Sequence, residues 1–291
     1  MHLIPSISRE SMLFSIFACC ICLGSMAEVT PTLDDLLDGY KAHNAIIQDV
    51  SVSYDVRWVR YDQPGQPESV ESRHWAKKAD KEILTLPYGA SENGAPSGLM
   101  LCIYDGVKTK VFARAFTEPR FKKGKVTEGK SNVFRELNPM YFLGGYLCQK
   151  SFEDLAGNPG AVLVRTEEPD YSDCVILQSP IGSDLVVKVY CSTTKGFMPI
   201  RIDGFWNGKI NQSFHSIELT KFATSLGDVW LPTYGIWSSY PRSTGILAHD
   251  QIFQARSIQI NSNLRNSLFD LNFPKDTIVE DSILETRHAV K

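Results

Sequence analysis

The spacing of hydrophobic and polar residues changes once along the chain, near residue 48. Before that point apolar residues recur every three or four positions, which is the period of a helix with one buried face. Thr32 is a good N-cap, and two aspartates follow it in the first turn. The pattern predicts an amphipathic helix over residues 31–47 whose buried face consists of Leu33, Leu36, Leu37, Tyr40 and Ile47.

After residue 50 the period becomes two. Val52, Tyr54, Val56 and Trp58 alternate with polar residues, which is typical of a strand with one buried face. Similar segments continue almost to the C-terminus, separated by short turns that carry Gly or Asp, such as Asp105-Gly106. We predict further strands at residues 99–104, 108–113, 162–166, 174–179, 185–192, 199–205, 209–219 and 229–240, with another pair near 252–260.

These short connections favour antiparallel pairing, because parallel strands need long crossovers. The sequence therefore predicts an α+β fold that is mainly antiparallel β, with one N-terminal amphipathic helix. No internal repeat and no linker divides residues 28–291, so we expect a single domain there.

Two regions interrupt the strand pattern. Residues 138–148 begin with Asn-Pro and are apolar nearly all round, which predicts a short helix weakened by Gly144-Gly145, and a second short helix is expected at 151–155. Residues 62–68 and 89–98 are predicted surface loops.

The stretch 114–130 carries six basic and two acidic residues. It is predicted to be a solvated loop, and contact with an anionic partner is the alternative.

The N-terminus resembles a targeting segment. An apolar run of about 13 residues begins at Met12; as a helix it covers about 20 Å, too short for a hydrocarbon core of about 30 Å. Ser25-Met-Ala27 then provides small residues for cleavage, so we predict a signal peptide over residues 1–27; the alternative is a short buried helix. A weak lipobox-like match leaves lipid anchoring at Cys19 or Cys20 open.

Four cysteines follow this segment: Cys102, Cys148, Cys174 and Cys191. Their spacing fits neither a zinc site nor a redox pair. Cys174 and Cys191 lie on two strands of a predicted hairpin and could form a disulfide if the register is favourable. Buried free thiols are the alternative.

Composition and motifs exclude several classes of function. The net charge is −3, so there is no general basic surplus for nucleic acid. No nucleophile elbow, zinc-protease helix, phosphate-binding loop or dinucleotide fingerprint is present, and the histidines after residue 27 stand apart from one another. We therefore predict no catalytic residues, no metal, no cofactor and no enzymatic activity.

Aromatic residues are the notable feature of the predicted sheet. Trp58, Trp206, Trp230 and Trp237 lie in or beside its strands. If the two predicted helical regions cover one face of the sheet incompletely, a hydrophobic cleft remains between them. The alternative is that the aromatic side chains fill the core.

Several segments together resemble the outer-membrane lipoprotein-sorting carriers, the LolA-like periplasmic proteins. These are the helix followed by Val52-Ser-Tyr-Asp-Val56, then Phe197-Met-Pro-Ile-Arg-Ile202 and Asp228-Val-Trp-Leu-Pro232. The segment 269–281 is similar to the closing element of long relatives. The similarity covers most of the chain, although this chain is longer than a typical carrier.

The resemblance implies a curved half-barrel sheet with helices on its concave face over an apolar cavity. Carriers of this kind hold acyl chains without covalent chemistry, so the implied partner is a lipid or lipoprotein and the implied location is the periplasm or cell envelope. The residues expected to form the cavity and its lid are Tyr141, Phe142, Leu143, Tyr146, Leu147 and Trp58.

The same half-barrel also serves sensory proteins of the envelope. The alternative function is therefore a regulatory or structural module that binds a membrane-protein partner through the basic stretch or a sheet edge.

Overall fold

The computed structural model describes residues 31–63, 65, 69–90, 96–116, 118, 122–131, 134, 146–147 and 150–291. The chain divides into two compact units, Met1–Thr32 and Leu33–Lys291. The predicted signal peptide, residues 1–27, lies outside the described residues and stays a prediction. The second unit carries all of the elements described below.

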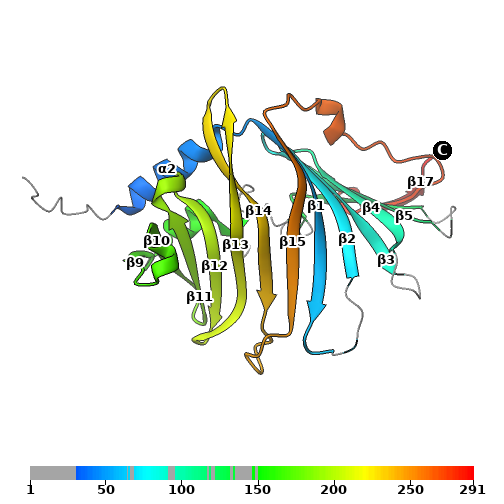
Figure 1. Cartoon of the computed structure of the whole chain (residues 1–291). Coiled ribbons are helices and arrows are strands. Elements are labelled where there is room, and N and C mark those ends of the chain that lie inside the picture. The colour runs from blue at the N-terminus through cyan, green and yellow to red at the C-terminus, as the bar shows by residue number, and fades with distance from the viewer. Residues whose placement is uncertain are drawn as a thin grey trace, which may run out of the picture. The chain divides into compact units, whose positions relative to one another are not determined.

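Fifteen strands form one large sheet in this unit (Figure 1). In sheet order it runs β17-β16-β6-β5-β4-β3-β2-β1-β15-β14-β13-β12-β11-β10-β9. The strands are β1 (Asp49–Arg60), β2 (Ser69–Lys78), β3 (Lys81–Ala90), β4 (Pro96–Tyr104), β5 (Lys108–Ala115), β6 (Lys122–Glu128), β9 (Val162–Arg165), β10 (Cys174–Ile181), β11 (Leu185–Ser192), β12 (Met198–Trp206), β13 (Lys209–Thr224), β14 (Gly227–Ser239), β15 (His249–Ile260), β16 (Ile278–Asp281) and β17 (Thr286–Ala289).

The sheet consists of two antiparallel meanders that meet at its centre. Strands β1 to β6 follow one another on one side, and strands β9 to β15 follow one another on the other. They are joined by β1 and β15, which pair antiparallel from Val50–Ile260 to Arg60–His249. The predicted mainly antiparallel α+β fold is confirmed.

One pair in the sheet is parallel. Strand β16 lies beside β6, with Ile278 opposite Lys123 and Asp281 opposite Val126, and β17 then forms the outer edge. At the opposite end of the described strand order lies β9, which pairs with β10. Among the described residues the sheet is therefore not closed, and β17 and β9 are its outermost strands.

The N-terminal helix α2 (Leu33–Ala45) is confirmed and packs on one face of the sheet. Leu36 and Tyr40 are buried with the short helix α4 (Phe152–Ala156) against strands β10 to β13, and the Tyr40 and Phe152 rings lie 4.3 Å apart. We call this the helix-covered cluster: Leu36, Tyr40, Phe152, Leu155, Ala156, Val175, Leu177, Val187, Val189, Cys191, Ile202 and Phe214.

The face that carries α2 is the inner face. Four residues lie in register across this face, each opposite the next on the neighbouring strand: Phe214, Trp237, Gln251 and Trp58. The inner face therefore extends from the helix-covered cluster across β13, β14 and β15 to β1. A second apolar group on this face is the central cluster: Val50, Val52, Tyr54, Val56, Trp75, Leu84, Leu86, Cys102, Phe134, Leu231 and Phe253.

On the opposite face the described buried apolar residues form two clusters, one toward each end of the sheet. At one end Phe269 and Leu271, which precede β16, cover Ala76, Ile83 and Ile103. At the other end the 3-10 turn Pro169–Tyr171 places Tyr171 over a further small group of residues, which includes Cys174, Ile176, Tyr190 and Ile200. Between these ends, residues of β1 such as Ser51, Ser53 and Asp55 are not buried, as the alternation in the sequence predicts.

The position of α2 depends on a glycine and a histidine. A Cβ atom at Gly39 would lie 2.2 Å from the Phe197 ring, so only glycine allows the helix to approach the β11–β12 connection this closely. His43 is buried, and its Nε2 accepts a hydrogen bond of 3.1 Å from the backbone N–H of Trp230. Helix and sheet are thus joined by both packing and a buried polar contact.

Several sequence predictions were incomplete or wrong. The stretch 114–130 is not a solvated loop, because residues 122–128 form β6, held between β5 and β16. Strands β2 and β3 were missed, and residues 252–260 form part of one strand rather than a pair. The helix predicted at 138–148 lies outside the described residues except for Tyr146–Leu147, where the prediction is wrong because the backbone forms strand β7.

The fold makes a direct prediction for the helix-covered cluster. Replacing Phe152, which is fully buried, with alanine should lower the free energy of unfolding by about 3–5 kcal/mol, because the cavity cannot close completely. Replacing Phe116, which is 53% exposed, with alanine should change it by less than about 0.5 kcal/mol. Urea unfolding of both variants tests this; equal losses would contradict the assigned packing.

Candidate functional site

The predicted lid residues are only partly described. Tyr141, Phe142 and Leu143 lie outside the described residues, and their role stays a prediction. The backbones of Tyr146 and Leu147 form β7, which pairs with β8 (Lys150–Ser151) in a two-stranded sheet immediately before α4. The side chains of β7 also lie outside the description.

Trp58 is the predicted site residue whose side chain the structure describes. It lies on the inner face near the end of β1, opposite Gln251 of β15, with its ring 5.7 Å from that of His249. Its Nε1 atom is buried and has no hydrogen-bond partner among the residues that the structure describes. A buried donor without a partner costs about 1–3 kcal/mol, so this one requires an explanation.

A second buried polar atom without a partner lies on the same face. The Ser216 hydroxyl on β13 has no hydrogen-bond partner within the described part of the chain. Ser216 is in register with Gly235, Phe253 and Val56 across the sheet. Ser216 and Val56 are therefore on the inner face. A ligand lying along this face could satisfy both polar atoms.

The described helices cover only part of the inner face. Helices α2 and α4 contribute to the helix-covered cluster over β10 to β13. In the central cluster, the described residues from outside the strands are Phe134 and Ile47. Among the described residues, the sheet therefore provides nearly all of this second apolar surface.

Charged residues are buried beside the central cluster. Arg73 of β2 is 4% exposed, and its Nε lies 3.1 Å from the Glu71 carboxylate. Glu82 of β3 is 2% exposed and forms an ion pair with Lys130, while Trp75 Nε1 donates to it over 3.4 Å. Sequence reasoning missed these residues because nothing in a single strand shows which charge faces the core.

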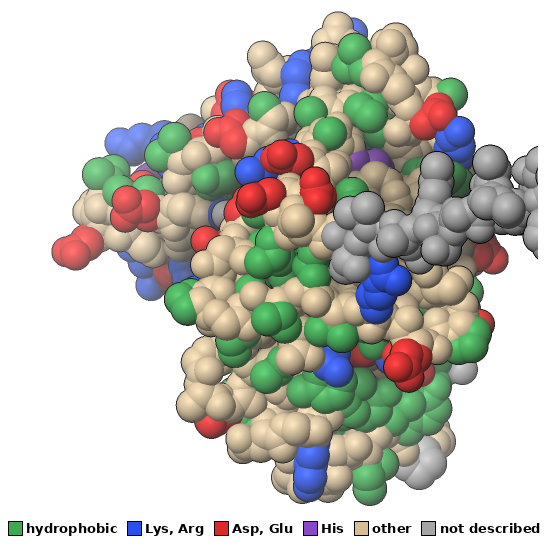
Figure 2. All heavy atoms as spheres, turned by 90° about the vertical axis from the view of Figure 1, so that its left-hand side faces the viewer, with side chains coloured by type: hydrophobic (Ala, Val, Ile, Leu, Met, Phe, Trp, Pro, Cys, Tyr) green, Lys and Arg blue, Asp and Glu red, His purple; other side chains and the backbone are tan. Residues whose placement is uncertain are grey.

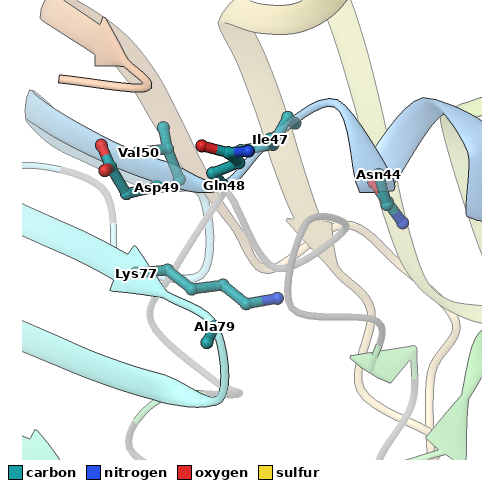
Figure 3. Close-up of a pocket in the computed structure, with 7 residues that line it drawn as sticks. All are labelled: Asn44, Ile47, Gln48, Asp49, Val50, Lys77 and Ala79. Carbon is teal, nitrogen blue, oxygen red and sulfur yellow. The ribbon is translucent and has the colours of Figure 1, made fainter. Parts of the chain in front are cut away.

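A small hollow opens where α2 passes into β1 (Figure 3). It has a volume of about 30 Å³. A water-sized group needs roughly 10–15 Å³, so two such groups fit and an acyl chain does not. Its lining residues are Asn44, Ile47, Gln48, Asp49, Val50, Lys77 and Ala79.

The register between β10 and β11 bears on whether Cys174 and Cys191 can form the disulfide considered in the sequence analysis. Cys174 lies opposite Ser192 and Cys191 lies opposite Val175, so the two thiols are on opposite faces of the sheet. Both are free and buried, and burial raises the pKa of Cys174 to about 12. The favourable register on which that disulfide depended is not present.

A polar group of residues on the opposite face is held together internally. The Tyr171 hydroxyl lies 2.8 Å from His215 Nε2, and Arg201 bridges Glu168 and Asp203 at 3.0 and 2.8 Å. Each member has a partner within the group, which anchors the turn at Tyr171 to β12 and β13.

The described residues contain no group of three or more His, Cys, Asp or Glu side chains that could hold a metal ion. None of the helices in the described part of the chain has the length and apolar character needed to cross a bilayer.

Comparison with known proteins identifies the fold. No family model and no curated protein matches the sequence. The structure is similar to an outer membrane lipoprotein-sorting protein domain from Vibrio parahaemolyticus, with a TM-score of 0.52 and 10% identity, covering 82% of this chain and 95% of that one. It is also similar to a DUF1329 family protein from Desulfovibrio piger, with a TM-score of 0.50 and 11% identity, covering 81% of this chain and 97% of that one. The resemblance to lipoprotein-sorting carriers predicted from the sequence is thus confirmed at the level of fold.

Because Trp58 Nε1 has no hydrogen-bond partner among the described residues, we can predict how its loss affects stability. Replacing Trp58 with phenylalanine keeps a ring and removes the donor, so the free energy of unfolding should stay within about 1 kcal/mol of the wild type. Replacing Trp75 with phenylalanine takes a hydrogen bond from buried Glu82 and should cost about 1–3 kcal/mol. Urea unfolding compares the two; an equal cost would mean that the Trp58 N–H has a partner within the protein.

Burial of His43 predicts a dependence of stability on pH. Burial lowers the pKa of His43 below its ordinary value of 6.5, so the unfolded chain binds the proton more readily than the folded one. The resulting stability is fully present above pH 6.5 and is lost as the pH falls below it. The variant His43→Gln should lose less unfolding free energy between pH 7 and pH 5 than the wild type does.

Urea unfolding at the two pH values measures this difference. His288→Gln, at an exposed position in β17, is the matched control and should lose as much as the wild type. Identical pH profiles for His43→Gln and the wild type would contradict the prediction.

Proposed function

We propose that this protein is an exported carrier that holds an acyl chain of a lipid or lipoprotein against the inner face of its sheet. Cleavage after residue 27 would leave residues 28–291 as the carrier. Binding is non-covalent, and Trp58 together with residues 141–143 and 146–147 contributes to the binding surface.

The observation that carries the proposal is the buried Trp58 N–H on an apolar face, for which the described residues offer no hydrogen-bond acceptor. The inner face is continuous from the helix-covered cluster to β1, and the described helices cover it only over β10 to β13. An ester or amide carbonyl at the head of an acyl chain could accept from Trp58 Nε1, and its methylenes would lie on the neighbouring apolar side chains.

The energetics suit this role. Burying a methylene group contributes about 0.8 kcal/mol, so about ten of them contribute about 8 kcal/mol, equivalent to a micromolar complex. Such binding needs no charge and no reactive group at the tail, in keeping with the absence of catalytic motifs in the sequence. The similarity in fold to a lipoprotein-sorting protein domain also supports the proposal.

A second candidate is a protein-binding module of the envelope. It is favoured by β9, the outermost described strand on its side of the sheet, where Val162 and Val164 are 46% and 43% exposed. Figure 2 faces the side of the molecule on which β9 lies and shows hydrophobic side chains gathered on that surface. An edge of this kind can pair with a strand of a partner.

Native mass spectrometry with lipid extraction tests the first function. The full chain, expressed in a bacterium and purified from its periplasm, should carry a stoichiometric adduct that is released as lipid. Trp58→Ala should lower its occupancy at least several-fold, and so should the double variant Phe142→Asp, Leu143→Asp.

Trp230→Ala is the matched control. The Trp230 ring packs below Lys195 at 5.6 Å, and in β14 it alternates with Leu231 of the central cluster, so it lies off the inner face. Its occupancy should equal that of the wild type. A mass without any adduct, with capture of a partner protein that Val162→Lys and Val164→Lys abolish, would instead support the second candidate.

A further inference from the structure

Ser216 is a polar residue on the apolar inner face, at the boundary between its two clusters. It follows Phe214 of the helix-covered cluster by two positions on β13, and it is in register with Phe253 of the central cluster across β14 and β15. Ser216 is 5% exposed, and its hydroxyl has no hydrogen-bond partner among the described residues. Buried hydroxyls are nearly always hydrogen-bonded, so this one indicates a partner that the described part of the chain does not supply.

The backbone beside Ser216 departs from a regular ladder. Directly opposite it on β14 is Gly235, where a Cβ atom would lie 2.8 Å from a backbone oxygen of β13 and 3.3 Å from the Phe214 ring. Between Ser216 and Glu218 the register with β14 shifts. Bulges of this kind redirect side chains and are frequent beside functional sites. The sheet thus presents a hydroxyl at this point of the inner face, with no side chain directly opposite it.

Trp58 marks the other end of the same surface, four neighbouring strands wide (Figure 1). Gln251 lies directly opposite Trp58, so its side-chain amide is on the same face. Trp58 is three strands away from Ser216 and two residues beyond Val56, which is in register with Ser216. With strands about 4.8 Å apart and residues about 3.3 Å apart along a strand, Trp58 and Ser216 are separated by about 15 Å. Between them lie the buried apolar side chains of Val56 and Phe253.

A ligand bound to both residues must carry two separate polar groups. The Trp58 N–H can only donate, so it requires an oxygen acceptor such as the carbonyl at the head of an acyl chain, whereas the Ser216 hydroxyl both donates and accepts. The ester oxygens of a glycerolipid are attached to adjacent carbons of one glycerol unit, so they cannot reach both atoms. The group at Ser216 must then be carried by the chain, about 12 carbons from the head at about 1.3 Å per bond.

We propose that Ser216 is a specificity-determining residue of the acyl-binding surface, which selects chains that carry a hydroxyl group about 12 carbons from the head carbonyl. The inference rests on the proposed function, since it assumes that the chain lies on the inner face between Trp58 and Ser216. An unsubstituted chain leaves the Ser216 hydroxyl without a partner. A site of this kind discriminates against ligands that lack the matching polar group.

The test compares two fatty acids of the same chain length. Stearate and 12-hydroxystearate each compete with a neutral fluorescent probe for the purified full-length protein. We expect the wild type to bind 12-hydroxystearate at least about ten-fold more tightly, because only that chain pairs with the buried hydroxyl. Ser216→Ala should remove this preference and leave the affinity for stearate unchanged.

Two control variants and one further ligand separate the contributions. Ser257→Ala, at an exposed position on β15, is the matched control and should keep the preference. Trp58→Phe removes the donor at the head, so it should weaken both fatty acids by the same factor and also keep the preference. A chain with its hydroxyl at carbon 3 places that group far from Ser216, so 3-hydroxystearate should bind no more tightly than stearate.

Unfolding of the ligand-free protein tests whether the hydroxyl is satisfied within the chain. Ser216→Ala removes a buried group without a partner, so the urea midpoint should not fall. Ser213→Ala takes a hydrogen bond of 2.6 Å from buried Asp203 and should lower it. A lower midpoint for Ser216→Ala would show that the protein itself pairs this hydroxyl, which overturns the inference.

The outcomes distinguish the inference from the proposed function. Equal affinity for stearate and 12-hydroxystearate, or a preference that survives Ser216→Ala, overturns selection by Ser216 and leaves the carrier function intact. If neither fatty acid binds, selection by Ser216 is overturned, and the lipid adduct from the periplasm decides the carrier function separately. A preference that is lost in Ser216→Ala and kept in Ser257→Ala supports the inference.

Discussion

An open sheet with one continuous apolar face is the constraint on which the rest of this structure depends. Fifteen strands that do not close into a barrel have two faces and two edges to protect. The protein covers one edge region with its C-terminal hairpin and one part of the inner face with α2 and α4. Among the described residues the sheet provides nearly all of the central cluster, and the buried Trp58 N–H and the hollow beside Val50 lie on the same face.

The placement of α2 links packing to the site. Gly39 allows the helix to lie against Phe197, and His43 ties it to β14. This position determines where the chain enters β1, and hence where Asn44, Ile47 and Gln48 meet Lys77. A change that moved α2 away from Phe197 would therefore open the hollow as well as weaken the core.

The sequence allowed most of this fold to be predicted, because alternation and turn residues are local signals. It identified α2, α4 and nine strand regions, from the period at Val52–Trp58 to turns such as Asp105-Gly106. It missed β6 because lysines at 122, 123 and 125 look solvated, although pairing with β5 and β16 holds that strand. Trp58 was found from its position in an alternating strand. Lys77 and Glu82 were not identified, because they lie opposite each other only through the register between β2 and β3, which cannot be read from either segment alone.

The pairing of β1 with β15 has a consequence for how the chain folds. The centre of the sheet joins Val50 to Ile260, so its contact order is high and its closure entropy must be overcome before that pairing stabilises anything. During synthesis the β1–β6 meander is complete long before its neighbour exists, and β1 presents an unpaired edge until about residue 260 has emerged. A chain of this topology completes its sheet only after most of it has been synthesised. Until then, correct folding requires that the unpaired edge of β1 does not pair with strands of other chains.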